Sequence, residues 1–181
     1  YNDPRSINHC LLGLEVLGKA KVLEDIESVE RRIIEKAIEY HGLKELPGDL
    51  DGEILLFCQL IRDADKIDIF YVVLDYYTQY RDNPAGFKLE IELPDEPGYS
   101  VEIVELILNE QRVDYDKLKT WNDMKLLQLS WVYDVNFIAT LERIKERKYL
   151  EMIIEFLPDT SDITKVAEKI YEYVDQRIEQ S

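Results

Sequence analysis

Apolar residues recur along most of the chain at the three- and four-residue spacing of amphipathic helices, and this pattern predicts an all-α fold. Asp3 is the expected N-cap of the first helix, because an aspartate before a proline suits a helix start. The second helix is expected to open at Asp25 or Ser28 and to end at His41. The helices predicted from these signals cover residues 4–18, 25–41, 51–80, 101–108, 124–133, 135–157 and 163–178.

The chain is predicted to form a single helical domain over residues 1–181, since it contains no repeat, no low-complexity tract and no obvious linker. Residues 1–80 form its first group of helices and residues 101–181 the last. Between them, residues 81–100 are expected to be a loop or extended arm. Within it, alternating apolar residues at 88–93 favour a short strand or an arm.

The predicted long helix is apolar on nearly every side over residues 54–74, which indicates a central, buried element. Asp63 and Asp65 interrupt its apolar stripes. Buried carboxylates are costly unless they are paired, hydrogen-bonded or bound to a metal. Two interpretations remain: an ion-pair network in which Arg62 or Lys66 pairs with the aspartates, or a metal site.

The only two histidines of the chain lie on helical faces that are expected to pack inward. A lone inward histidine is usually a hydrogen-bonded core residue, but two of them beside an acidic helix favour a metal site. Imidazole and carboxylate together suit Zn, Mn, Fe and similar ions. His9 is expected to face the core with Leu12, Gly13, Val16 and Leu17, and His41 with Val29, Ile33, Ile34 and Ala37.

Charge and composition narrow the classes of partner. The net charge of −16 opposes binding to a long nucleic acid, although a small phosphorylated ligand remains compatible with local cations. Residues 89–110 hold seven acidic and no basic side chains, which indicates a solvated face or, alternatively, a docking surface. No apolar run reaches the ~18 residues of a membrane span. No export signal is visible, so a cytoplasmic location is expected, with Cys10 and Cys58 as buried free thiols.

Three segments resemble the HD superfamily of metal-dependent phosphohydrolases, in the order in which the family has them. Residues 2–13 are similar to the start of the helix that carries the first of two additional family histidines, and residues 37–41 to the end of the helix that carries the second. The most specific match is I-R-D-A-D-K-I-D at 61–68, which resembles the family element R-D-A-D-K-L-D. Residues 129–137 resemble the C-terminal helical part of one bacterial branch. The resemblance implies an HD-like helical bundle with extra C-terminal helices.

The same resemblance implies a set of metal ligands. Asp65 matches the family's last metal-ligating aspartate, and Asp63 matches a neighbour of that ligand. His9 and His41 match the histidines that hold an additional metal in multinuclear members. The implied cofactor is a divalent metal ion, with Mn, Fe, Ni, Zn and Mg all compatible. The first histidine and the His-Asp dyad of the family have no counterpart in the printed chain.

The implied activity is hydrolysis of a small phosphorylated molecule, such as a nucleotide, by metal-activated water. Lys66 and Arg62 are the candidates for stabilising charge in the transition state, with ion pairing as the alternative role for both. The alternative function is a catalytically inactive HD-like module that binds a nucleotide or a protein partner. An unrelated helical bundle with structural histidines is the third interpretation. Self-association into a homo-oligomer is also expected, because apolar surface would be exposed if family helices were absent.

Overall fold

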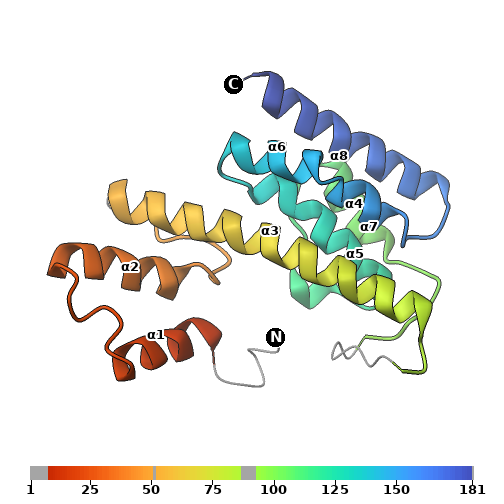
Figure 1. Cartoon of the computed structure of the whole chain (residues 1–181). Helices are drawn as coiled ribbons and strands as arrows, with labels where there is room; N and C mark the ends of the chain where they lie inside the picture. Colours follow the sequence, from red (N-terminus) through yellow and green to blue (C-terminus); the bar gives the residue numbers. More distant parts are fainter. Residues whose placement is uncertain (1–7, 51, 87–92, 181) are drawn as a thin grey trace. The chain divides into compact units, whose positions relative to one another are not determined.

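The computed structural model describes residues 8–50, 52–86 and 93–180, and all regular structure within these ranges is helical. The predicted all-α fold is thereby confirmed (Figure 1). Two short elements, η2 and η3, are 3₁₀ turns. In chain order the elements are α1 (His9–Lys19), α2 (Ser28–Tyr40), α3 (Gly52–Asp82), α4 (Val101–Leu108), η2 (Tyr115–Lys117), α5 (Trp121–Ser130), η3 (Trp131–Asp134), α6 (Ile138–Glu146), α7 (Tyr149–Ile154) and α8 (Ser161–Glu179).

The internal contacts of the chain divide it into two compact units, residues 1–65 and residues 66–181, here called the N-terminal and the C-terminal unit. The division falls inside α3, between Asp65 and Lys66. Each unit has its own hydrophobic cluster. The prediction of one domain over the whole chain stays a prediction.

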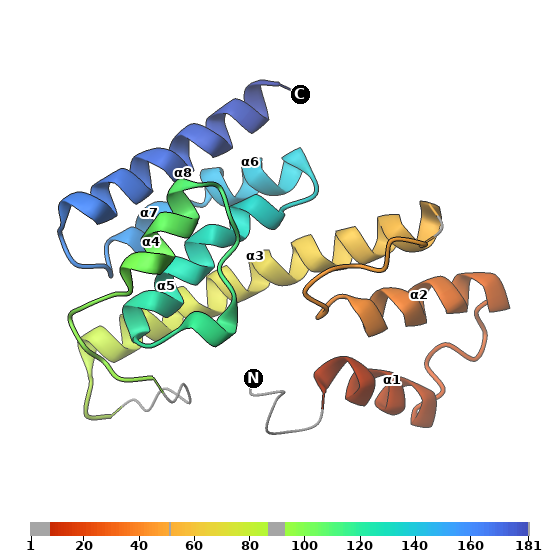
Figure 2. The same ribbon diagram turned by 180° about the vertical axis from the view of Figure 1, so that it is seen from behind.

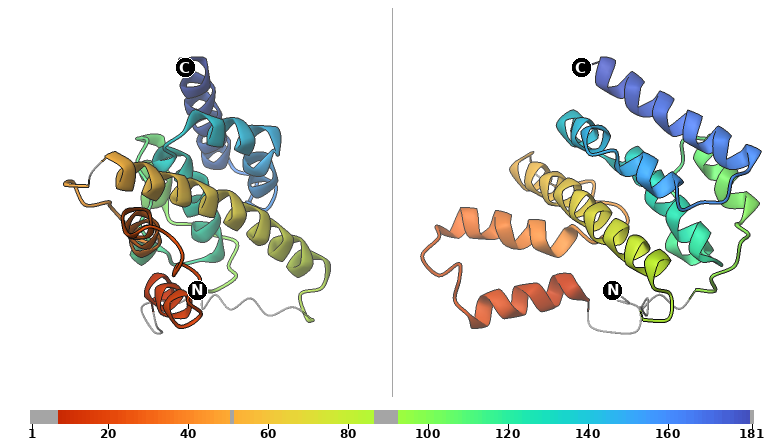
Figure 3. Two further views of the ribbon diagram at one scale, coloured as in Figure 1. Left: turned by 60° about the vertical axis from the view of Figure 1, so that its left-hand side comes forward. Right: turned by 45° about the vertical axis from the view of Figure 1, so that its right-hand side comes forward.

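In the N-terminal unit, α1 and α2 lie side by side and run in opposite directions (Figures 1 and 3). The first half of α3 runs parallel to α2. Cys58 contacts the carbonyl of Lys36 at 3.8 Å, and one turn further along α3 Arg62 donates to the carbonyl of His41 at 3.2 Å. The core of this unit is small and consists of Ala37, Ile54 and Cys58, with Ile33, Tyr40, Leu46, Leu50 and Ile61 packed against it.

The apolar surface of the N-terminal unit is only partly covered. Among its described residues, nine large apolar side chains are at least 40% exposed. Three of them lie on α3, which therefore departs from the buried helix expected over 54–74. The nine residues are Leu11, Leu12, Val16, Val22, Val29, Leu43, Leu56, Phe57 and Leu60.

The C-terminal unit is built around α5, all ten residues of which are buried. The last helix, α8, lies along one side of this unit beside α4 and α6 (Figures 1 and 2). Its buried residues recur every three or four positions, as the sequence pattern predicts: Ile163, Val166, Ile170 and Val174. The fully buried side chains of the unit include Phe70, Ile103, Ile107, Leu126, Leu129, Leu141, Ile144, Leu150 and Ile153.

The polar residues of α5 are hydrogen-bonded inside the C-terminal unit, as buried polar groups must be. The ammonium of Lys125 donates to Asn122 Oδ1 and to the carbonyl of Phe156, both at 2.9 Å. Burial lowers the pKa of Lys125. The hydroxyl of Tyr77 donates to Gln128 Oε1 at 2.9 Å. These bonds allow a helix with polar residues on several sides to occupy the centre of a core.

Most predicted helices are confirmed, but residues 135–157 form two helices rather than one. The break falls at Arg147 and Lys148, where Lys148 adopts a left-handed φ of 56°. No glycine or proline marks this break in the sequence, which explains why the pattern did not reveal it. The last two helices are separated at Pro158 as predicted, and Thr160 caps α8 by accepting from the Ile163 amide.

The start of α1 also differs from the prediction. The described helix begins at His9, and the side chain of Asn8 accepts a hydrogen bond from the Leu11 amide at 3.1 Å. Asn8, rather than Asp3, is therefore the N-cap of α1. Asp3 itself lies outside the described residues. The strand or arm predicted at 88–93 also falls outside them, apart from Leu93.

The acidic stretch 89–110 presents its described carboxylates to solvent, in agreement with the interpretation as a solvated face. Glu102 pairs with Lys117, and Glu110 pairs with Lys169 at 2.7 Å. None of the helices in the described part of the chain combines the length and apolar character that crossing a bilayer requires.

Asp123 joins three segments of the C-terminal unit and has no exposed surface. Its carboxylate accepts from the Ser100 amide at 2.6 Å and from the Ser100 hydroxyl at 2.9 Å. It also accepts from the amides of Lys119 at 2.9 Å and Thr120 at 3.1 Å, and it completes a capping box with Thr120. One side chain thus ties the starts of α4 and α5 together.

Asp123→Ala is expected to lower the free energy of unfolding by about 3 kcal/mol, because several buried donors would lose a charged acceptor. The matched control is Asp116→Ala, an exposed aspartate of η2 that should change stability by no more than about 0.5 kcal/mol. Urea unfolding followed by tryptophan fluorescence measures both. Equal stability of the two variants would contradict this role of Asp123.

Candidate metal centre

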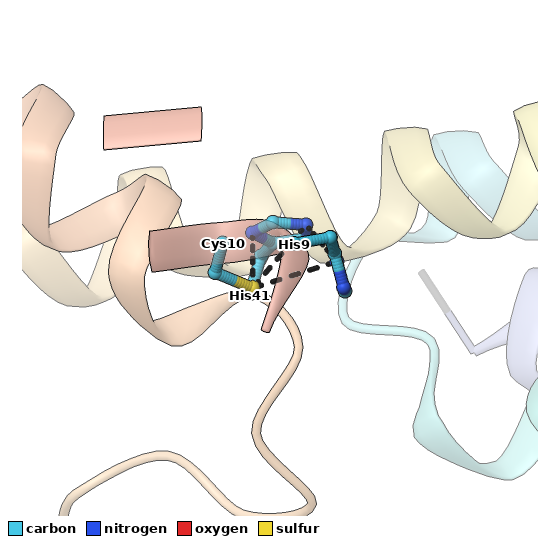
Figure 4. A group of neighbouring side chains, drawn as sticks. All are labelled: His9, Cys10 and His41. Atoms are coloured by element: carbon cyan, nitrogen blue, oxygen red, sulfur yellow. Dashed lines mark hydrogen bonds between the residues drawn. The ribbon is translucent and has the colours of Figure 1, made fainter. Parts of the chain in front are cut away.

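The two histidines of the chain lie together in the N-terminal unit. His9 is the first residue of α1 and His41 follows the last residue of α2. Because the two helices are antiparallel, the start of one meets the end of the other. The Nε2 atoms of the two rings are 3.2 Å apart, and the rings meet edge to face with centroids 5.0 Å apart (Figure 4).

Cys10 is the third member of this cluster, although from the sequence it is expected to be only a buried free thiol. Its Sγ lies 3.4 Å from His9 Nε2. It lies 3.6 Å from His41 Nδ1 and 3.9 Å from His41 Nε2. One ligand atom from each of the three residues falls within a group no wider than 4.8 Å. The cluster therefore brings two imidazole nitrogens and one sulfur close together.

The position of Cys10 corrects the predicted face of α1. The prediction placed Leu12 and Val16 inward beside His9, but the structure exposes both. The covered face is rotated by one residue and contains Cys10, which is 2% exposed, while His9 lies at its edge half-buried. This face consists of Cys10, Gly13, Leu14 and Leu17, which have helical spacing as regular as the predicted set. The signal was present, but the pattern did not discriminate between the two faces.

The ring of His41 is oriented by the backbone. Its Nδ1 lies 2.7 Å from the carbonyl of Ile38, so Nδ1 carries the proton and donates it to this carbonyl. In the neutral ring, Nε2 then carries the lone pair, and His9 Nε2 lies 3.2 Å from it. Cys10 Sγ lies beside the same ring, slightly nearer to Nδ1 than to Nε2. Such a second hydrogen bond is typical of metal-ligating histidines, because it fixes both the tautomer and the ring orientation. Without a metal, the His9 Nε2–H can donate to this lone pair.

The separation of the two imidazole nitrogens fits a shared metal ion. Zinc–nitrogen bonds of about 2.0–2.1 Å in tetrahedral geometry place two nitrogens about 3.3 Å apart. The observed Nε2–Nε2 distance of 3.2 Å agrees with that edge. His9 and His41 could therefore bind one ion with no change in their separation.

Gly42 leaves the space in which the cluster sits. A Cβ at this position would lie 2.9 Å from Cys10 Sγ, 3.3 Å from His9 Cε1 and 3.6 Å from His9 Nε2. The first of these distances is shorter than a van der Waals contact. Absence of a side chain at position 42 is therefore a condition for the observed packing of sulfur and imidazole.

The two aspartates that match the family, Asp63 and Asp65, do not belong to the cluster. Asp63 is 2% exposed, whereas Asp65 is exposed to solvent on α3. Among the described residues, the group of converging ligand atoms contains neither of them. The structure thus brings together His9 and His41 from the predicted set and adds Cys10. The assignment of Asp63 and Asp65 as ligands stays a prediction.

Arg62 is buried and holds the segment that follows α2. Its guanidinium donates to the carbonyl of His41 at 3.2 Å, to that of Leu43, and to that of Lys44 at 3.5 Å. These carbonyls lie at or beyond the helix end, where intrahelical donors are missing. Arg62 therefore positions the backbone that carries His41. A role in stabilising a transition state stays a prediction.

Lys66 is held within the C-terminal unit. Its ammonium lies 3.1 Å from Asp134 Oδ2, and Arg112 donates to the same oxygen at 3.0 Å. This ion pair joins α3 to η3. From the sequence, Lys66 is expected to pair with an aspartate of its own helix, whereas Asp134 belongs to η3. The catalytic role of Lys66 also stays a prediction.

A hollow of about 490 Å³ lies between α1 and α2, formed by residues other than the cluster. Several of its charged residues pair with one another: Lys21 with Glu24 at 3.2 Å and Lys36 with Glu39 at 2.6 Å. Mutual pairing leaves little net charge for an anion, so we assign the hollow no ligand.

No family model matches the chain, and neither the curated proteins nor the solved structures provide a match to it. The HD resemblance therefore depends on the residues of the segments described above. The candidate centre depends on the geometry of His9, Cys10 and His41.

Gly42→Ala is expected to lower the free energy of unfolding by about 1–3 kcal/mol, because the added methyl group would overlap Cys10 and press on His9. Gly48→Ala is the matched control in the same unit, since nothing lies within 4 Å of a Cβ there. The control should be neutral or stabilise by up to about 1 kcal/mol. Thermal and urea unfolding measure both variants, and a fully stable Gly42→Ala protein would contradict the packing described.

Proposed function

We propose that this chain is an HD-type metal-dependent phosphohydrolase that acts on a small phosphorylated molecule, such as a nucleotide. The observation that supports it best is the convergence of the only two histidines. They are 32 positions apart in the chain, yet their Nε2 atoms lie 3.2 Å apart. The resemblance independently assigns these two residues to one metal. Free cysteines agree with the cytoplasmic location that belongs to this proposal.

The chain's own residues would hold and orient the metal. His9 and His41 supply nitrogen ligands, the Ile38 carbonyl sets the tautomer of His41, and Arg62 fixes the backbone after it. A divalent ion bound there lowers the pKa of a coordinated water and polarises a phosphoryl oxygen. In this proposal Asp65, which is exposed in the same unit, is a ligand at the family's other metal position.

The substrate is proposed to be small because of charge. With 38 acidic and 22 basic residues, the surface repels an extended phosphate backbone. One or two phosphates can still be bound by a metal and nearby cations, since local charge dominates in a confined site. A mononucleotide fits this requirement, whereas a long nucleic acid does not.

The test begins with metal content of the purified full chain, measured by mass spectrometry after loading with Mn, Fe, Ni, Zn or Mg. We expect about one equivalent of a transition metal, and at least a tenfold weaker affinity in His41→Ala. A panel of phosphomonoesters, phosphodiesters and nucleotides then measures hydrolysis. Activity should be lost in His41→Ala and Asp65→Ala.

The control for these variants is Glu53→Ala, which removes an exposed carboxylate from the first turn of α3. It should retain both metal and activity. Full metal occupancy without cleavage of any phosphoester would overturn the hydrolase and leave the alternative function, an inactive HD-like binding module.

The nine exposed apolar side chains of the N-terminal unit favour a second candidate, self-association of the chain as a binding module. We expect light scattering to show a concentration-dependent increase in mass. Replacing Leu56 and Leu60 on α3 with Gln should shift the chain toward the monomer without loss of helix content. Replacing Val101, an exposed apolar residue of the other unit, with Gln is the control. A monomer at all concentrations would contradict this candidate.

A further inference from the structure

We propose that Cys10 is a thiolate ligand of the metal ion held by His9 and His41, so that the centre is a two-nitrogen, one-sulfur site for a zinc-like ion. The proposal rests on the proposed function to the extent that both require the two histidines to share a metal. The present proposal goes beyond the proposed function by adding a sulfur ligand, which neither the helical pattern nor the family resemblance supplies.

The distances of the sulfur fit this assignment. A zinc–sulfur bond of about 2.3 Å and a zinc–nitrogen bond of about 2.0–2.1 Å place the two ligand atoms about 3.6 Å apart in a tetrahedron. Cys10 Sγ lies 3.4 Å from His9 Nε2 and 3.9 Å from His41 Nε2. All three interatomic distances are therefore within about 0.3 Å of tetrahedral values. Because Cys10 Sγ also lies 3.6 Å from His41 Nδ1, a small rotation of the Cys10 side chain or of the His41 ring would bring the sulfur toward an ion bound at Nε2.

The surroundings of Cys10 hold its sulfur beside the two imidazoles, and a bound cation would offset the cost of a negative charge at this buried position. Cys10 is the second residue of α1, where the aligned peptide dipoles of the helix create a partial positive charge. The side chain is 2% exposed, and the absence of a Cβ at Gly42 provides its space. The sulfur is thus held in place beside the two imidazoles rather than free to rotate into solvent.

A thiolate changes which ions the centre selects. Sulfur and imidazole ligands favour zinc and similar transition metals, whereas Mg²⁺ and Ca²⁺ prefer oxygen. On binding, the Cys10 S–H bond gives its proton to solvent and a sulfur lone pair forms the bond to the metal, so no electron is transferred. Three protein ligands leave one tetrahedral position open for another ligand.

Cobalt(II) substitution tests the sulfur directly, because a thiolate bound to Co²⁺ produces a charge-transfer absorption in the near ultraviolet. The matched pair of variants is Cys10→Ser and Cys58→Ser. Cys58 is the other buried free cysteine, on α3, and burial raises the pKa of its thiol. We expect the band in the wild-type chain and in Cys58→Ser, and its loss in Cys10→Ser. Zinc affinity should fall at least tenfold in Cys10→Ser alone. A band that persists in Cys10→Ser would overturn the proposal.

Zinc-edge X-ray absorption of the wild-type chain provides a second readout that needs no folded variant. One sulfur at about 2.3 Å together with nitrogens at about 2.0 Å is expected. A shell of only nitrogen and oxygen overturns the assignment of Cys10.

Phosphoester hydrolysis by the same samples separates this inference from the proposed function. Sulfur coordination without hydrolysis supports Cys10 and overturns the phosphohydrolase. Hydrolysis with a shell free of sulfur overturns Cys10 and leaves the phosphohydrolase standing.

Discussion

The candidate centre depends on the hydrogen bonds from Arg62 to the carbonyls that follow α2. The last carbonyls of a helix have no intrahelical donor, and a buried guanidinium supplies several donors at once. These bonds fix His41 at the end of α2 and bring the adjacent Gly42 against Cys10 and His9. The arginine of the segment I-R-D-A-D-K-I-D thus has a structural role, whatever the role of its aspartates.

The two units differ in the size of their cores and in the kinds of side chains that they cluster. The C-terminal unit has a large core around α5, with Asp123 and Lys125 satisfied by internal hydrogen bonds. The N-terminal unit has a core of few residues and many exposed apolar side chains, yet it contains the clustered nitrogen and sulfur ligands. A bound metal would add to the stability of this unit by mass action, because an ion that binds only the folded state favours it.

The helices could be predicted from hydrophobic spacing because most of them bury one continuous face. α4 matches its predicted bounds, and α8 lies within a few residues of them. The break at Lys148 was missed because a lysine in a left-handed conformation has no distinct sequence signal. The aspartates of α3 illustrate a different limit: the pattern predicted both as inward, but Asp63 is buried and Asp65 is exposed. A helix that is apolar nearly all round does not define which side meets a neighbour.

The sequence by itself determined the all-α fold, the positions of most helices and the choice of His9 and His41 as candidate metal ligands. It did so because helical periodicity and rare residue types are local properties of the chain. Only the tertiary structure decided that the two rings meet and that Cys10 joins them. In α1, two apolar faces one residue apart have the same spacing, and their difference of about 100° in direction decides whether Leu12 or Cys10 faces α2. That choice is made by packing against residues some thirty positions away, which no local pattern contains.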